Sequence, residues 1–262
     1  MGSSSTFLIL GLVISVVSTA GSFFYSDKFV LLTSGAKPAD KKTYFDVYTV
    51  TENMAIASGV PMPKLYVIQD QSPNAFATGR DPKHGVICVT TGLLSILNRS
   101  EIEGVIAHEL SHIKNYDTLL MSVVSVLVGT IALASNWIMQ SLWWGGRDSD
   151  SRSDRNPIFF IGLILSIIIG PIVATLMQLA ISRRREYLAD ASGALLTRHP
   201  EGLASALEKI SAYPVPLRSA NPATAHLFIS SPFRKTQKSS LIQSLFSTHP
   251  ATEDRVRILR TM

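Results

Sequence analysis

The sequence HELSH occupies residues 108–112, and the organisation of the rest of the chain can be worked out from it. Just upstream, Ser100-x-x-Glu103 matches a capping box, so we expect a helix that begins there and runs through His112. Residues four apart share one face of a helix, so both histidines can reach one metal ion. Glu109 is displaced from them by one position, which suits a general base rather than a ligand. The alternative at this point is a pair of surface histidines on an ordinary helix.

A hydrolytic zinc site needs a further ligand, because such sites take three protein ligands and keep one position open. Glu186 opens the sequence EYLAD, in which a helix would place Glu186 and Asp190 on one face. We therefore predict one zinc ion per chain, bound by His108, His112 and Glu186. Asp190 would accept a hydrogen bond from a ligand histidine and fix its tautomer. Two alternatives stay open: Glu186 pairs only with the arginines at 183–185, or the ligand set holds another first-row metal.

Three long apolar segments predict membrane spans. Residues 6–24, 119–142 and 158–181 contain no Asp, Glu, Lys or Arg, although these types make up 16% of the chain. Each segment is apolar around the whole helix circumference, and a span needs about 20 such residues. Buried core helices are the alternative, which the length of the segments disfavours. The first segment lacks the basic leading region of a secretory signal, so we interpret it as an anchor.

The distribution of positive charge indicates which side of the membrane is cytoplasmic. Eight lysines and arginines flank one side of the proposed spans, against three arginines in the loop between the second and third spans, so the first side is the expected cytoplasmic one. The net charge of +5 comes without an aromatic-interleaved basic patch, so we expect no nucleic-acid partner. The single cysteine excludes an internal disulfide and a metal-binding cysteine cluster.

Hydrophobic periodicity outside these spans predicts an α+β fold. A helix over residues 44–59 precedes short strands at 65–68 and 85–90, with the turn-bounded segment 73–79 between them, and together they predict a small sheet. Further helices are expected over residues 183–196, 201–213 and 253–260. The fold class is therefore a mainly helical domain with a small β-sheet, plus transmembrane helices.

Several motifs taken together resemble one known family. HELSH at 108–112, PNAFATG at 73–79 with VTTGLL at 89–94, SRRREYLAD at 182–190 and STHP at 247–250 are similar to the HtpX group of bacterial membrane metallopeptidases. The resemblance covers nearly the whole chain from about residue 26. It implies a zincin-type catalytic domain facing the cytoplasm, a transmembrane hairpin inserted between the two metal-binding helices, and proteolysis of misfolded or damaged membrane proteins in the bacterial inner membrane.

The resemblance also implies roles for individual residues. It makes His108, His112 and Glu186 the zinc ligands, in agreement with the helical spacing, and leaves Glu109 as the general base. His249 resembles a histidine that related enzymes place near the metal, where it could donate to the developing oxyanion; a capping or packing histidine is the alternative. The NAFATG stretch resembles a strand that pairs with an extended substrate, unless it is an ordinary turn and strand. The residues expected to contact substrate are Asn74, Ala75, Phe76 and Ala77.

We expect four regions along the chain. An anchor at 6–25 resembles the second of the two spans that usually precede the family's catalytic domain, so the first is absent. The catalytic domain is then divided by the transmembrane hairpin at 118–182: its first half covers 40–117 with the HELSH helix, and its second half covers 183–262 with the third zinc ligand. In the second half, Arg255 is expected to hold the C-terminal helix to the core.

The expected partners are membrane-protein or unfolded polypeptide substrates and the lipid bilayer, with the oligomeric state left open. Two alternatives to a membrane-bound zinc endopeptidase remain at this point. One is a CAAX-prenyl-type peptidase, and the other is a non-catalytic metal-binding membrane adaptor.

Overall fold

The computed structural model describes residues 21, 24–124, 183–213, 215–218, 224–230 and 250–262. Nearly all of the predicted anchor and most of the predicted hairpin lie outside these residues. Among the described residues, no helix is both long and apolar enough to cross a membrane.

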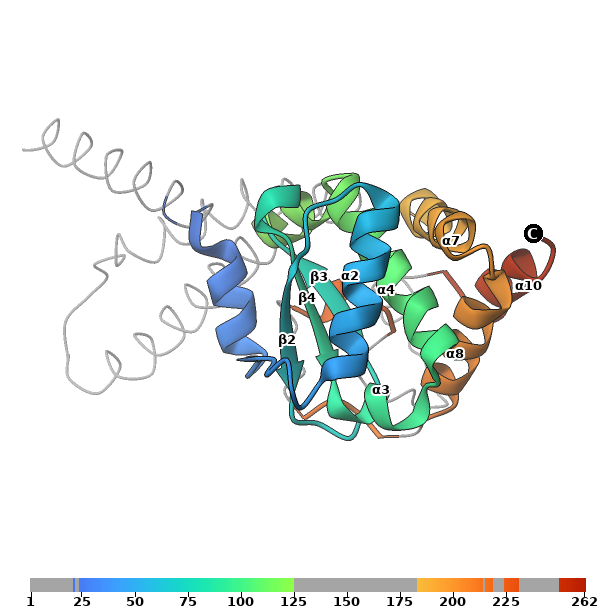
Figure 1. Ribbon diagram of the computed structural model, residues 1–262, viewed down its shortest axis with the longest axis horizontal. Coiled ribbons are helices and arrows are strands. Elements are labelled where there is room, and N and C mark those ends of the chain that lie inside the picture. Colours follow the sequence, from blue (N-terminus) through green and yellow to red (C-terminus); the bar gives the residue numbers. More distant parts are fainter. Residues whose placement is uncertain (1–20, 22–23, 125–182, 214, 219–223, 231–249) are drawn as a thin grey trace, which may run out of the picture.

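A small mixed sheet lies at the centre of the described residues (Figure 1). Its strands run in the order β1-β2-β4-β3, with β2 and β4 parallel and the outer pairs antiparallel. The strands are β1 (Lys37–Pro38), β2 (Lys64–Ile68), β3 (Ala75–Thr78) and β4 (Val86–Thr90). β2 and β4 match the two predicted strands, and β3 lies within the segment 73–79 that was predicted to belong to the sheet. β1 was missed because two exposed residues carry no alternating pattern. The order makes β3 an edge strand.

Helices surround this sheet and confirm the predicted mainly helical α+β class. Figure 1 shows α4 between the sheet and the helices α7 and α8, in agreement with its contacts to all three. The short helix α3, directly after β4, was not predicted. The helices are α2 (Phe45–Ser58), α3 (Thr91–Ile96), α4 (Arg99–Lys114), α7 (Arg183–Thr197), α8 (Pro200–Ala212) and α10 (Thr252–Leu259), with further helical residues at 24–33 and 117–124.

The predicted capping box of α4 is wrong by two residues. Asn98, not Ser100, is the N-cap: its side chain accepts a hydrogen bond from the Glu101 amide at 3.0 Å, and the Glu101 carboxylate accepts one from the Asn98 amide at 2.8 Å. Ser100 already lies inside the helix, and its hydroxyl donates to the Asn98 side chain. An asparagine in extended backbone before the first helical residue outcompetes a serine within the first turn.

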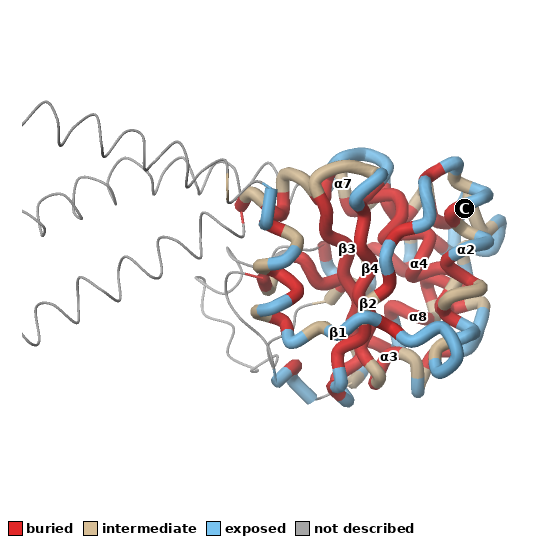
Figure 2. Tube along the Cα trace, turned by 60° about the vertical axis from the view of Figure 1, so that its left-hand side comes forward, coloured by how far each residue is buried: buried red, intermediate tan, exposed pale blue. Residues whose placement is uncertain are grey.

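The core runs through the sheet and α4, where Figure 2 shows most of the buried chain. Every residue of β4 is buried, and at its centre Cys88 is fully inaccessible to solvent. Burial, with the charge of Glu109, raises the pKa of the Cys88 thiol. On the other side of α4, a Cβ added at Gly104 would lie 2.7 Å from the Leu203 backbone nitrogen, so this glycine lets α4 and α8 pack in close contact.

Candidate metal centre

Three predicted ligands converge between α4 and α7. The Nε2 atoms of His108 and His112 lie 3.2 Å apart, and the Glu186 carboxylate oxygens lie 3.9 Å and 3.6 Å from them, respectively. Two donor atoms each about 2.1 Å from a tetrahedral zinc ion would be roughly 3.4 Å apart. One imidazole nitrogen from each histidine and one carboxylate oxygen, all within 4.8 Å of one another, therefore fit a zinc ion.

Close packing of the two helices brings the ligands together. His108 and His112 share one face of α4, as the spacing predicts, while Glu186 lies in the first turn of α7. Gly193 permits the close approach of α7, because a Cβ there would lie 3.2 Å from the His108 backbone nitrogen. All three predicted ligands are at least 95% buried, so the place where they meet is held away from bulk water.

Asp190 lies behind the first histidine. Its Oδ1 atom is 3.0 Å from His108 Nδ1, which leaves Nε2 directed at the other ligands. Burial lowers the pKa of His108 despite this contact, so the ring is neutral, donates from Nδ1 and presents the Nε2 lone pair. Burial alone would raise the pKa of Asp190, but the charge and hydrogen bonds of Arg255 outweigh it and lower the pKa to about 2. The carboxylate is therefore ionised.

Asp117 lies behind the second histidine, a position that no sequence pattern predicted. Its Oδ2 atom is 3.0 Å from His112 Nδ1, and its Oδ1 atom pairs with Arg185. Burial disfavours a charged His112, but the bond to Asp117 and the nearby carboxylates outweigh it and raise the pKa to about 9. Asp117 follows His112 by five residues, which is no helical spacing. Tyr116, at a left-handed φ of 60°, turns the chain after α4 and returns Asp117 to the site.

Arg255 reaches the same site from α10. Its guanidinium donates to both Asp190 oxygens at 2.8 Å and 2.6 Å, lies 3.5 Å from a Glu186 oxygen, and donates to the Ile229 carbonyl at 3.3 Å. The side chain is 98% buried. Arg255 was predicted only to hold the C-terminal helix to the core. In the structure it also supplies the positive charge beside two buried carboxylates, Asp190 and Glu186.

Glu109 lies beside the ligands and is 98% buried. Burial raises its pKa to about 7, with a contribution from the charge of Glu186, while His112, Arg255 and the Ala77 backbone amide act in the opposite direction. A carboxylate with a pKa near 7 can both accept and return a proton at neutral pH.

The edge of β3 at this site is already paired. Residues 228–230, here called the 228–230 segment, run antiparallel to it: the Ile229 amide donates to the Ala75 carbonyl at 2.9 Å, and Phe76 bridges Phe228 with their rings 5.0 Å apart. The Asn74 side-chain nitrogen donates to the Ser230 carbonyl at 3.0 Å. The four predicted substrate contacts, Asn74 to Ala77, are all buried, and Asn74, Ala75 and Phe76 contact the 228–230 segment. His249 lies outside the described residues.

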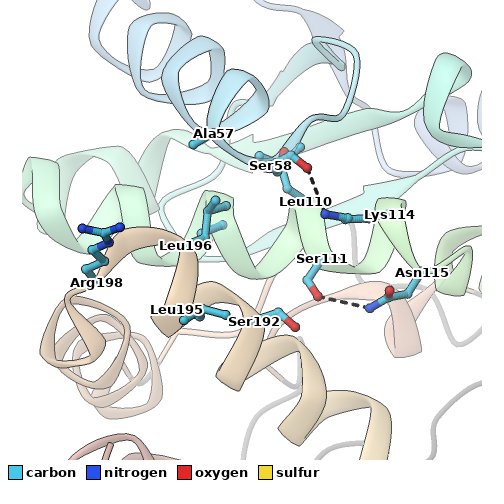
Figure 3. A pocket seen from close by; sticks show the side chains of 11 residues that line it. Ala57, Ser58, Leu110, Ser111, Lys114, Asn115, Ser192, Leu195, Leu196 and Arg198 are labelled. Carbon is cyan, nitrogen blue, oxygen red and sulfur yellow. Dashed lines mark hydrogen bonds between the residues drawn. The ribbon is translucent and has the colours of Figure 1, made fainter.

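An open groove of about 610 Å³ lies on the other face of α4, between α2 and α7 (Figure 3). Lys114 crosses it and donates to the Ser58 carbonyl at 2.9 Å. The groove is lined by α4 residues that alternate with the ligands, including Leu110 and Ser111, and none of the metal ligands reaches it. It is therefore separate from the metal centre.

Comparison with known proteins agrees with this geometry. The sequence model of peptidase family M48 matches residues 42–262, which include all three predicted ligands. The chain belongs to peptidase family M48. This M48 chain is 51% identical over 242 residues to a protease HtpX homolog of Caldanaerobacter subterraneus, covering 90% of this chain and 78% of the relative. It is 46% identical over 255 residues to a protease HtpX homolog of Pyrococcus furiosus, covering 97% and 86%.

A solved structure shares the fold. Ste24p of S. mikatae matches with a TM-score of 0.56 and 19% identity, over 96% of this chain and 58% of that one. The predicted resemblance to HtpX is confirmed by the HtpX relatives, and so is the enzyme class: M48 peptidases are zinc metalloproteases, and this member carries a donor set that fits zinc. Its substrates are polypeptides.

Proposed function

We propose that this M48 peptidase is an inner-membrane endopeptidase that cleaves misfolded or damaged membrane proteins at the cytoplasmic face. The observation that carries the proposal is the buried convergence of His108, His112 and Glu186 with Glu109 beside them. When bound there, zinc supplies Lewis-acid activation of water and of the scissile carbonyl. Glu109 takes the proton of the attacking water and returns a proton to the leaving amine. His249 is proposed to donate to the developing oxyanion.

Replacing the base without touching the ligands tests this assignment. Glu109→Gln in detergent-purified full-length protein should retain zinc by elemental analysis and lose casein cleavage. Glu103→Gln is the matched control, because Glu103 lies on the same helix at the surface and pairs with Arg99. Near-normal cleavage by zinc-loaded Glu109→Gln would remove Glu109 from the role of base. A prenylated peptide beside casein, tested on the unaltered enzyme, separates the CAAX-prenyl-type alternative.

We also propose that an extended substrate pairs with β3 in place of the 228–230 segment. Support comes from the kind of contacts that hold this segment: Asn74, the Ala75 carbonyl and Arg255 all bind its backbone, so they would bind the backbone of any extended peptide. Recognition through backbone groups reads little side-chain identity, which agrees with broad specificity for unfolded segments. The apolar surroundings of Phe228 and Ile229 would favour apolar side chains at these two positions.

Weakening the segment's own pairing tests this competition. Ser230→Pro removes the amide that donates to the Asn74 side chain at 3.3 Å, whereas Ser230→Ala keeps it. If substrate and segment compete, Ser230→Pro lowers KM for unfolded casein relative to Ser230→Ala. An unchanged or higher KM in a variant of normal thermal stability would show that substrate binds elsewhere.

The membrane arrangement is proposed from the charges and the apolar segments: an anchor at 6–25 and a hairpin at 118–182 whose outer ends return to the cytoplasmic side. Single cysteines at Ser149 and Ser239 test it. An impermeant thiol reagent should label the first from outside intact cells and the second only after lysis. The opposite pattern would reverse the orientation, and equal labelling of both would contradict the hairpin.

A further inference from the structure

Two residues far apart in the sequence, Asp117 and Arg185, pair beside the metal centre. Asp117 begins the helical residues 117–124, and Arg185 lies in the first turn of α7. The Arg185 guanidinium pairs with one oxygen of Asp117, and the other oxygen lies 3.0 Å from His112 Nδ1. One carboxylate therefore joins a predicted metal ligand on α4 to the first turn of α7.

The local geometry holds this carboxylate in place. Asp117 is 98% buried, so its charge requires partners, and His112 and Arg185 supply them. Tyr116 adopts a left-handed backbone conformation, which a tyrosine rarely adopts and which persists only where the surroundings enforce it. The turn that this conformation makes is what carries Asp117 back beneath His112.

The arrangement repeats the one behind the other ligand histidine. Asp190 contacts Nδ1 of His108 at 3.0 Å and is itself held by Arg255. Each ligand histidine thus has a buried carboxylate at Nδ1 and an arginine behind that carboxylate. The two sets differ in exposure: Arg255 is 98% buried, whereas the Arg185 side chain, in the first turn of α7, is 39% exposed.

We propose that Asp117 is a positioning residue for the metal and that Arg185 holds Asp117 in place, so that the Asp117–Arg185 pair sets the orientation of His112. The proposal rests on the proposed function in taking His112 as a ligand. A carboxylate behind a ligand histidine fixes its tautomer and ring orientation, and losing such a partner typically costs about 10 to 100-fold in metal affinity or activity. Loss of the Asp117–Arg185 pair would then weaken zinc binding although neither residue is a ligand.

Zinc affinity, measured by competition with a chromophoric chelator on full-length protein in detergent, tests the inference. We expect Asp117→Ala to weaken zinc binding about 10 to 100-fold and to shift the d–d absorption of the cobalt-substituted protein. Asp117→Asn can still accept from His112 but carries no charge for Arg185, so it should lie between Asp117→Ala and wild type. Arg185→Ala should also weaken binding, and the double variant Asp117→Ala/Arg185→Ala should be no weaker than Asp117→Ala alone.

Two controls separate the possible failures. Arg184→Ala removes the same charge from the neighbouring, exposed position of α7 and should leave zinc affinity unchanged. Wild-type affinity and cobalt spectrum in both Asp117 variants would overturn the inference, and equal effects of Arg185→Ala and Arg184→Ala would overturn the role of Arg185. Glu186→Ala, measured alongside, distinguishes these results from failure of the proposed function, because full zinc binding by that variant would mean that the site itself is misassigned.

Discussion

Removing the Arg255 guanidinium should cost more stability than almost any other single change in this domain. The guanidinium donates to Asp190 and lies 3.5 Å from Glu186, and both carboxylates are 99% buried. Arg255→Met leaves these two buried charges without that partner. Removing one partner of a buried ion pair typically costs about 3–5 kcal/mol, against a total of roughly 5–15 kcal/mol for a domain. Arg255→Lys keeps the charge but loses the two-pronged contact with Asp190, so its cost should be smaller.

Pulse proteolysis in urea is a suitable assay, because it does not depend on a tryptophan and α10 contains none. Every variant is made with Glu109→Gln to prevent self-cleavage. The matched control is Arg257→Met, on the same helix, where a 73% exposed arginine pairs with Asp254 at the surface and should contribute no more than about 1 kcal/mol. Equal unfolding midpoints for Arg255→Met and Arg257→Met would refute the reasoning.

Three further predictions concern ligands and packing. Glu186→Ala should lower zinc content far more than Asp190→Ala, because only the first removes a ligand; equal, full zinc content in both by elemental analysis would contradict that. Burial opposes ionisation of Glu101, but its hydrogen bonds with Lys209, Ser205 and the Asn98 amide outweigh burial and lower its pKa from 4.5. The ionised Glu101 therefore stabilises the folded state at pH values above 4.5. This stabilisation is lost as the pH falls through the lowered pKa of the folded state. Glu101→Gln should therefore cost about 1–3 kcal/mol at pH 7, with the difference from wild type shrinking below pH 4.5 in thermal unfolding. Gly104→Ala should cost about 1–3 kcal/mol in the same measurement, because its methyl group would meet the α8 backbone at Leu203, and an unchanged melting temperature would show that α8 moves freely.

The sequence was most informative where function and periodicity coincide. His108, His112 and Glu186 were predicted from spacing and ligand type, and the structure brings them within 4.8 Å of one another, because a helix keeps residues four apart on one face. Asp190 lies at His108 for the same reason, since it is four residues from Glu186 on α7.

Contacts that depend on tertiary structure escaped prediction. Asp117 reaches His112 through a left-handed turn at Tyr116. Tyrosine rarely adopts this backbone conformation, so nothing in the sequence indicated a turn there. The pairing of Ile229 with Ala75 joins segments far apart in the sequence, and no periodic pattern encodes it. At α4 the error was local: two overlapping capping motifs compete, and the asparagine outside the helix wins over the serine inside it.

The burial of Cys88 makes this protein convenient for chemical mapping. It is the one cysteine in the sequence, it lies fully inside β4, and its thiol pKa is raised, so it carries almost no thiolate at neutral pH. Maleimides and other thiol reagents attack the thiolate, and they need access to it. The unaltered chain therefore serves as the unlabelled control. A reporter cysteine can be placed at a surface position, and labelling can be assigned to it without replacing Cys88 in the core.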